Sequence, residues 1–410
     1  MNFNNRIFLI LVVLLSAHWS LWSQSEHPLV KHLVQDGLEN VVLIEKDAHF
    51  YLAYENNRYR YEGRALAEVL MAAHKYLPQD ADKISILIKR ENIPMTLVES
   101  GRGALEALMI GVMSYDDWTQ QALFSFSTDR VSRVFEDHPV ENSSFYKVDL
   151  PVGVFLDYAL GNFENGVRID LNAQPELHTD LGNGLGLNMG YLVHVEDDLF
   201  YNNTSYPFIW RFTQNMRLKE NQFLNINMGY FSFARFGLHV RYANYVLEER
   251  LSFDMQYGIT QTGYLDPELK LNQNSNPLHS FTAGLTYRWN KADTDFSFHY
   301  GKFILSDIGY RVSVQRQFDE VFIGLFLVKT SVGDNLGFNF SAPMMGKKYM
   351  KPGRVRVRPA DRFDLLYRYT AFNGAGLEYS TGENLMFEIK EYYPQILKKA
   401  IPLYINTLNL

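Results

Sequence analysis

The chain has 410 residues and a formal net charge of −7, and 47% of its residues are hydrophobic. This composition excludes a disordered chain, which is poor in apolar residues, and a basic nucleic-acid-binding domain. The absence of cysteine excludes disulfides, a thiolate nucleophile, a cysteine-ligated metal and lipid attachment at an N-terminal cysteine. At roughly 100–200 residues per domain, the length fits two or three domains, or one small domain followed by a barrel.

Residues 1–24 have the pattern of a secretory signal peptide. Arg6 precedes the apolar run from Ile7 to Leu15, and small and polar residues follow up to Gln24. An uncleaved membrane anchor is the alternative, but a spanning helix needs about 20 apolar residues, and neither this run nor any later one is that long. We therefore predict export, and a closed barrel as the remaining way to cross a membrane.

Residues 25–100 predict a small α+β domain. In chain order we expect a helix at 28–35 closed by Gly37, strands at 40–44 and 49–54, a helix at 66–77 stopped by Pro78, and strands at 83–89 and 95–98. This order favours a small sheet with its helices on one face. We expect residues 101–143 to form a helical and polar connector.

From residue 144 onward the hydrophobic period changes to two. In the clearest run, Leu251, Phe253, Met255, Tyr257 and Ile259 alternate with Ser252, Asp254, Gln256, Gly258 and Thr260. Such runs last about 9–13 residues, which matches the ~9–11 residues of a tilted membrane-crossing strand better than the ~5–6 of a soluble strand. We predict that residues 144–410 form a transmembrane antiparallel β-barrel of about 12–14 strands, with a soluble β structure as the alternative. The fold class is thus mostly β.

Two groups of charged residues are candidates for binding. A basic run that suits an acidic polysaccharide or lipid phosphates, or is an ordinary solvated loop, consists of Lys347, Lys348, Lys351, Arg354, Arg356, Arg358 and Arg362. A set expected to face the barrel lumen, where it would line a sugar path or fill the interior with hydrogen bonds, consists of Arg168, Asp170, Arg241, Asp254, Gln256, Arg288 and Arg311.

The sequence predicts no catalytic residue, metal or cofactor. The acidic clusters at 116–117 and 196–198 could supply metal ligands or catalytic carboxylates, but they lack the spacing of a calcium loop or of a catalytic pair, so solvated turns explain them better. His178 near Asp180 and His299 near Ser297 suggest a serine hydrolase, but no Gly-x-Ser-x-Gly motif and no evident acid to orient a histidine accompany them.

Several motifs resemble the YjbH/GfcD family of exopolysaccharide and capsule biosynthesis proteins of the bacterial outer membrane. They are Gly37-Leu38-Glu39-Asn40-Val41, Glu55-Asn56-Asn57-Arg58-Tyr59-Arg60, Arg64-Ala65-Leu66, Gly229-Tyr230-Phe231 with Arg235-Phe236-Gly237-Leu238, and residues 300–309 followed by 312–316. The resemblance implies an outer-membrane barrel with a periplasmic α/β domain that assists polysaccharide secretion. The chain departs from many members in lacking a lipoprotein cysteine and in carrying the domain-plus-strands unit once instead of twice.

From the resemblance we expect a non-enzymatic barrel with its N-terminal domain in the periplasm. The expected partners are exopolysaccharide or periplasmic export proteins and outer-membrane lipid, without nucleic acid. The single unit leaves two arrangements open, a barrel closed by one chain or a homodimer that pairs strand edges. A barrel hydrolase acting on lipid or glycan, and a general porin or adhesin, are the alternative functions.

Overall fold

The protein is mostly β, as predicted, and consists of a five-stranded sheet and a 15-stranded sheet. The structure, a computed structural model, describes residues 27–138, 140, 142–160, 166–197, 205–231, 234–265, 270–273, 276–369, 374–379 and 389–408. The predicted signal peptide lies outside these residues. Among the helices described, none is long and apolar enough to cross a membrane.

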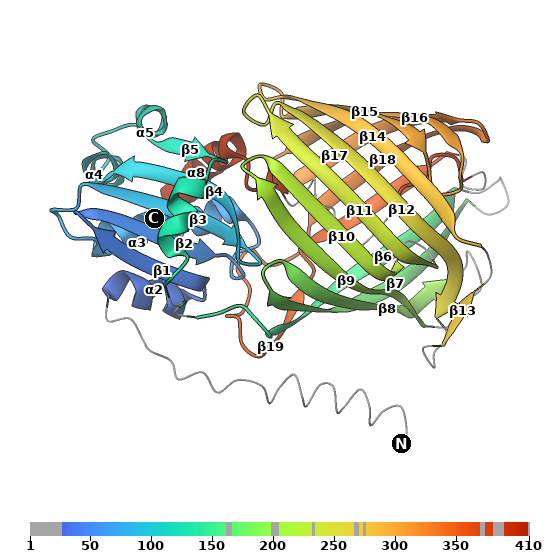
Figure 1. Cartoon of the computed structure of the whole chain (residues 1–410), viewed down its shortest axis with the longest axis horizontal. Helices are drawn as coiled ribbons and strands as arrows, with labels where there is room; N and C mark the ends of the chain where they lie inside the picture. Colours follow the sequence, from blue (N-terminus) through green and yellow to red (C-terminus); the bar gives the residue numbers. More distant parts are fainter. Residues whose placement is uncertain are drawn as a thin grey trace, which may run out of the picture.

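The five-stranded sheet and its helices form a small domain at one end of the molecule (Figure 1). Its elements are α2 (Pro28–Asp36), β1 (Glu39–Lys46), β2 (His49–Glu55), α3 (Glu62–Tyr76), β3 (Lys83–Arg90), β4 (Ile93–Gly101), α4 (Arg102–Met109), α5 (Tyr115–Gln121), β5 (Leu123–Ser125), α6 (Asp129–Ser132) and the 3₁₀ turn η1 (Arg133–Phe135). The sheet order is β1 to β5, and only β2 and β3 run parallel because α3 connects them.

Local sequence explains the first helices. Helix α2 ends at Gly37, whose φ of 109° suits glycine, and the Gly37 N–H donates to the carbonyls of Leu33 and Val34. In α3 the residues at helical spacing, including Leu66 and Leu70, are fully buried against the sheet.

The small sheet is covered on both faces, which differs from the expectation of helices on one face. Ala53, Leu87 and Leu97 point away from α3, and Val131 of α6 and Phe135 of η1 cover them. The reason is alternation, because an all-apolar strand presents apolar side chains to both sides of its sheet. The predicted connector at 101–143 therefore contributes β5 and a second layer to this domain.

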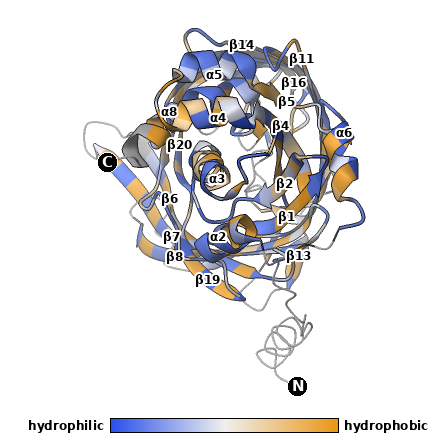
Figure 2. Cartoon of the chain, turned by 90° about the vertical axis from the view of Figure 1, so that its left-hand side faces the viewer, coloured by the Kyte–Doolittle hydropathy of each residue, from blue (hydrophilic) through white to orange (hydrophobic). Residues whose placement is uncertain are grey.

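The 15-stranded sheet runs up and down in chain order and rolls into a ring when viewed from the small domain (Figure 2). Its strands are β6 (Val148–Leu160), β7 (Val167–Gly182), β8 (Leu185–Asp197), β9 (Tyr206–Lys219), β10 (Gln222–Phe231), β11 (Arg235–Val246), β12 (Leu251–Leu265), β13 (Leu271–Gln273), β14 (Leu278–Trp289), β15 (Thr294–Lys302), β16 (Ile308–Phe318), β17 (Val321–Thr330), β18 (Gly333–Pro343), β19 (Val355–Pro359) and β20 (Arg362–Arg368). Among the strands described, short β13 pairs with β12 alone.

The large sheet is apolar outside and polar inside. On β12, Phe253 and Met255 are 45% and 51% exposed, whereas Asp254 between them is 1% exposed. The strand register aligns exposed apolar side chains in one row across six strands, formed by Phe253, Leu285, Phe298, Val312, Leu327 and Leu336. We call this row the outer belt. It is the reverse of a water-soluble domain, where the apolar face is the buried one.

The two ends of the large sheet approach each other. Strand β19 pairs in parallel with β6, where Val355 faces Val148, and the Ala360 N–H donates to the Val152 carbonyl at 3.0 Å. Beyond this point Tyr367 of β20 stacks on Tyr158 of β6, with ring centroids 5.8 Å apart. The hydrogen-bonded order still begins at β19 and ends at β20. Over residues 148–152, the edge of β6 is already paired with β19. A homodimer that paired strand edges would need this same edge.

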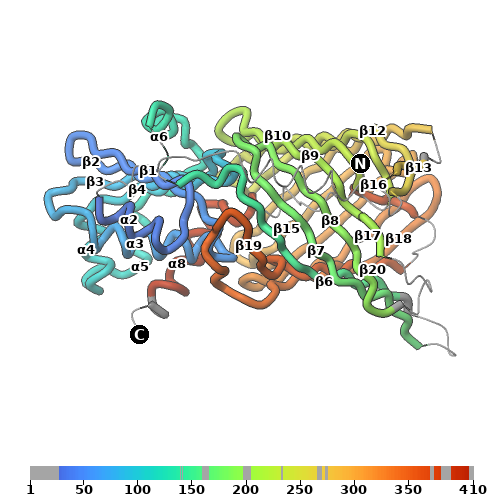
Figure 3. The backbone as a smooth tube through the Cα atoms, turned by 90° about the horizontal axis from the view of Figure 1, so that it is seen from below, coloured from blue at the N-terminus to red at the C-terminus, as the bar shows by residue number. Residues whose placement is uncertain are grey.

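The C-terminal helix α8 (Pro394–Leu408) returns to the small domain and packs on α3 (Figure 3). Leu397 and Ile401 are fully buried there, and the Cβ of Ala400 leaves no room for a side chain at Gly63. The range 144–410, predicted as barrel throughout, therefore also contains a helix of the small-domain core.

Candidate functional site

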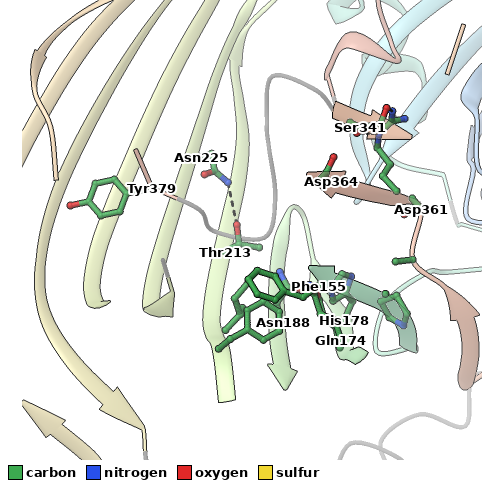
Figure 4. Close-up of a pocket in the computed structure, with 18 of the residues that line it drawn as sticks. Phe155, Gln174, His178, Asn188, Thr213, Asn225, Ser341, Asp361, Asp364 and Tyr379 are labelled. Carbon is green, nitrogen blue, oxygen red and sulfur yellow. Dashed lines mark hydrogen bonds and ion pairs between the residues drawn. The ribbon is translucent and has the colours of Figure 1, made fainter. Parts of the chain in front are cut away.

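The interior of the large sheet and the adjoining end of the small domain enclose a cavity of about 1590 Å³. Its walls carry amides, hydroxyls and charged groups from neighbouring strands (Figure 4). Asn225, for example, donates to the Thr213 hydroxyl at 3.2 Å inside this space. Such a surface can hydrogen-bond to water or to a ligand rich in hydroxyl groups.

Asp254 is the centre of a charged group on the cavity wall. The Asp254 carboxylate lies 3.5 Å from Arg241 and 2.9 Å from the Nε2 atom of His299. His299 is two strands away and reaches across Gly284, where any Cβ would lie 2.0 Å from the imidazole ring. Glycine at this position is therefore required for the His299–Asp254 contact.

The predicted lumen-facing residues divide into two sets. Arg241, Asp254, Gln256 and Arg311 line the cavity. Three others are absent from its lining: Asp170 is buried and accepts a hydrogen bond from Asn172, Arg288 is buried beside Asp295, and Arg168 is half-buried.

The predicted basic run does not form one surface. Arg356 is buried and donates to both carboxylate oxygens of Asp149, one at 2.8 Å, and Arg358 contacts the same carboxylate at 3.2 Å. Arg362 donates to the Ser341 hydroxyl at 2.7 Å. The exposed members of the run are Lys347, Lys348, Lys351 and Arg354. Of these, Lys348 pairs with Asp36.

The run divides because its C-terminal half is a strand. Arg356 and Arg358 share one face of β19, while Val355 and Val357 occupy the opposite, exposed face. The two arginines consequently point into the mouth, by which we mean the junction of the small domain with the near end of the large sheet. A polyanion would find only the exposed part of the run available.

Residues of the resemblance motifs meet at the mouth, and sequence reasoning did not single them out as a site. Buried Glu55 accepts from the Asn40 amide at 2.5 Å and from the backbone N–H groups of Glu91 and Asn92 at 3.0 Å. Glu39 lies beside Glu55. Burial raises the pKa of Glu39, although the ammonium group of Lys147 acts in the opposite direction. The signal in the sequence was that Glu39, Asn40 and Glu55 all belong to the two motifs at 37–41 and 55–60.

Two side-chain groups dock the small domain on the near end of the large sheet. Phe126 packs against Phe223 and Tyr245 at centroid distances of 6.2 and 6.1 Å. Arg217 of β9 donates to the Pro94 carbonyl at 2.6 Å and to the Thr128 hydroxyl at 3.0 Å. The small domain is therefore attached by both apolar and charged contacts.

We expect Arg217→Ala to loosen this attachment, because the Pro94 carbonyl loses its charged donor. Hydrogen bonds to charged groups contribute about 1.5–3 kcal/mol each, so proteolysis between residues 126 and 147 should accelerate at least about tenfold. Limited proteolysis of the folded protein measures this rate. The matched control is Lys219→Ala, which changes an exposed cation two residues away on the same strand and should leave the rate unchanged. Equal rates for the two variants would contradict the docking role.

The described residues contain no cluster of three or more His, Cys, Asp or Glu side chains arranged to hold a metal ion. The structure does place an acid, Asp254, beside His299. From the sequence alone, no acid that could orient this histidine was evident. The hydroxyl of Ser297, however, bonds to Thr286 at 2.9 Å, and His178 pairs with Glu176 at 2.6 Å. Neither histidine is bonded to a serine among the contacts described.

Residues 15–206 match a family model named YjbH and described as "Exopolysaccharide biosynthesis protein YbjH". The resemblance to the YjbH family is confirmed over this range. The match covers the small domain through η1 and continues through β8. The motifs at 229–238 and 300–316 lie beyond the matched residues. No curated protein matches the chain in sequence.

Proposed function

We propose that this chain is a non-enzymatic outer-membrane β-barrel of exopolysaccharide biosynthesis and secretion, with its small domain in the periplasm. The observation that carries the proposal is the inside-out large sheet. Its outer belt exposes six large apolar side chains in register, while charged groups such as Asp254 are buried behind them.

This arrangement costs free energy in water and is favourable in lipid. Soluble proteins rarely expose contiguous apolar patches above a few hundred Å², and burial of apolar surface contributes roughly 25 cal/mol per Å². A rolled sheet also satisfies backbone hydrogen bonds along its strands, which the interior of a bilayer requires. The meeting of β6 with β19 and β20 supports closure within one chain.

The family match suggests exopolysaccharide biosynthesis as the process. The lining of the cavity suits a saccharide chemically. Hydroxyl-rich saccharides bind through the kinds of amide, hydroxyl and charged groups that line the interior. The small domain, docked at the near end, is positioned to meet export proteins from the periplasm. Exposed Lys347, Lys351 and Arg354 lie on this side and suit lipid phosphates or an acidic glycan.

A pair of leucine substitutions tests the proposal. Leu285 lies in the outer belt, and Leu247 lies in a turn; both are exposed, by 39% and 69%. In a soluble protein arginine would be tolerated at either position, whereas in a membrane barrel it costs about 2–4 kcal/mol at mid-bilayer and little at the interface. In a deletion strain we expect wild type and Leu247→Arg to restore surface polysaccharide, and Leu285→Arg to fail through poor assembly. Equal complementation by both variants would contradict the proposal.

The His299–Asp254 pair favours a second candidate, a barrel hydrolase acting on lipid or glycan. That candidate predicts that Ser297→Ala abolishes hydrolysis of a lipid or glycan substrate by the purified protein. The non-enzymatic proposal predicts no hydrolysis by either protein and full complementation by Ser297→Ala. Ion conductance in planar bilayers without a polysaccharide phenotype would instead indicate a general porin.

A further inference from the structure

Strand β20 ends in the half of the large sheet that is far from the small domain. Arg368, the last residue of β20, pairs with Gly337, four residues after Gly333, where β18 begins at the far turn. The turn before β17 is at the near end, because its Glu320 pairs with Arg60 of the small domain at 2.5 Å. Two described parts of the chain, residues 374–379 and 389–393, lie in sequence between β20 and α8, and α8 belongs to the small domain.

The first described part, residues 374–379, lies inside the sheet at its far end. The Gly376 N–H donates to the Asp307 carboxylate at 2.8 Å, and the Leu377 carbonyl accepts from Ile304 at 3.3 Å. Glu378 then pairs with Arg311 of the cavity wall at 3.0 Å. These contacts hold the chain against β16 and the loop before it.

Tyr379 occupies the interior at the middle of the strands. Its hydroxyl lies 2.9 Å from the Thr260 hydroxyl and accepts from Ser280 at 3.1 Å. Its ring is 4.6 Å from that of His239, and a Cβ at Gly258 would lie 2.3 Å from the tyrosine oxygen. Figure 4 shows Tyr379 pointing to the strands on the side of the cavity opposite Asp361.

The second described part, residues 389–393, lies at the near end. The Lys390 ammonium contacts the Asp295 carboxylate of β15 at 2.5 Å. Tyr393 packs between Phe126 of the small domain and Tyr245 of the large sheet, at centroid distances of 5.8 and 5.5 Å. Helix α8 follows directly and docks on α3.

We propose that residues 374–379 and 389–393 form a strap that narrows the barrel lumen, and that α8 is the latch that holds it. This inference rests on the proposed function, because only in a membrane barrel is the interior a route. The inference adds that the protein's own C-terminal segment, the strap and α8, regulates passage through the lumen. Larger barrels either keep an open channel or are plugged from within.

The strap and the latch differ in the chemistry that holds them. Most strap contacts are single polar ones, and saccharide hydroxyls can replace the hydrogen bonds that Thr260 and Ser280 make to Tyr379. The latch is apolar, with Leu397 and Ile401 fully buried. Opening therefore requires displacement of α8, which a protein partner of the small domain can provide.

A disulfide tests where the strap lies, and the absence of native cysteine removes any background. A Cβ at Gly376 would lie 3.2 Å from that of Val328, near the ~3.5–4.5 Å of a disulfide. We expect Val328→Cys with Gly376→Cys to cross-link in the folded full-length protein, and the control pair Val328→Cys with Gly346→Cys to remain reduced. No cross-link in the first pair would overturn the strap.

Labelling tests the latch. Ser313→Cys reports from the cavity wall and Met345→Cys from an exposed loop. With a hydrophilic maleimide, Leu397→Glu should accelerate labelling of position 313 at least tenfold and leave position 345 unchanged. Tyr379→Ala, which keeps the latch, should accelerate it less.

Two results separate the strap from the proposed function. If Leu397→Glu retains heat-modifiable mobility yet labels no faster at position 313, the latch is overturned. If Leu397→Glu fails to fold, Tyr379→Ala tests the strap instead, and unchanged labelling of position 313 in that variant would overturn it. A protein found only in the soluble fraction would overturn the membrane proposal, while a 328–376 disulfide would still establish the strap.

Discussion

Arg356→Ala is expected to lower the unfolding temperature of the large sheet by about 6–12 °C. Arg356 is buried where β19 meets β6, and its guanidinium joins Asp149 of β6 to the Asn57 carbonyl of the small domain. Breaking a buried ion pair costs about 3–5 kcal/mol. Because Arg358 still contacts Asp149 at 3.2 Å, we expect about 3 kcal/mol, which for ~150–250 residues corresponds to the stated shift.

The control for this substitution is Arg354→Ala. Arg354 has the same side chain two residues earlier, but it is exposed, and exposed substitutions change stability by about 0.5 kcal/mol or less. Semi-native gel electrophoresis after heating to successive temperatures gives the transition for each variant. Identical transitions for the two variants would show that the β19–β6 contact does not limit stability.

Glu62→Gln is expected to remove a loss of small-domain stability at alkaline pH. Glu62 is buried in α3, where its carboxylate accepts from the Tyr54 hydroxyl at 2.6 Å. Burial, together with the negative charges of Glu391 and Glu55, raises the pKa of Glu62 to about 8, although hydrogen bonds from Tyr54 and Asn56 act in the opposite direction. The folded state therefore favours the protonated carboxyl group.

The sign of the pH dependence follows from the proton count. Below the ordinary glutamate pKa of 4.5 the carboxyl group is protonated in both states, and its full contribution to stability is present. As the pH rises towards 8, the unfolded chain releases the proton and the folded chain retains it, so stability falls. A shift of this size corresponds to a loss on the order of 3–5 kcal/mol at 1.36 kcal/mol per unit.

Urea unfolding at pH 5 and pH 9 measures this loss. In a protein that begins after the predicted signal peptide, replacing Trp210 and Trp289 by phenylalanine leaves Trp118 as the reporter of the small domain, in which it is fully buried. We expect the variant with Glu62 to unfold at markedly lower urea at pH 9, and Glu62→Gln to change much less. Glu45→Gln removes an exposed carboxylate and should behave like the parent. A parent without the pH dependence would contradict the raised pKa.

The strands and first helices could be predicted because their signals are local. Alternation along 251–260 places Phe253 and Asp254 on opposite faces by backbone geometry alone, and Gly37 ends α2 because it tolerates a left-handed conformation. These features need no knowledge of the rest of the chain.

Features that depend on distant residues could not be predicted in this way. The Asp254–His299 contact joins positions 45 residues apart. Gly284 makes room for this contact, but its role can be recognised only when the register of β12, β14 and β15 is known. The return of the C-terminal segment and the docking of α8 likewise follow from tertiary packing. Charge density along residues 347–362 predicts one basic patch, whereas the period of two along β19 places Arg356 and Arg358 together on its buried face.

Membrane fractionation combined with heat-modifiable gel mobility tests the central claim, the inside-out barrel, most directly. We predict that the full-length protein is recovered in the outer-membrane fraction, resists extraction with urea, and migrates faster before boiling than after it, because a closed barrel stays folded in cold detergent. Recovery in the soluble periplasmic fraction, with the same mobility before and after boiling, would contradict the account.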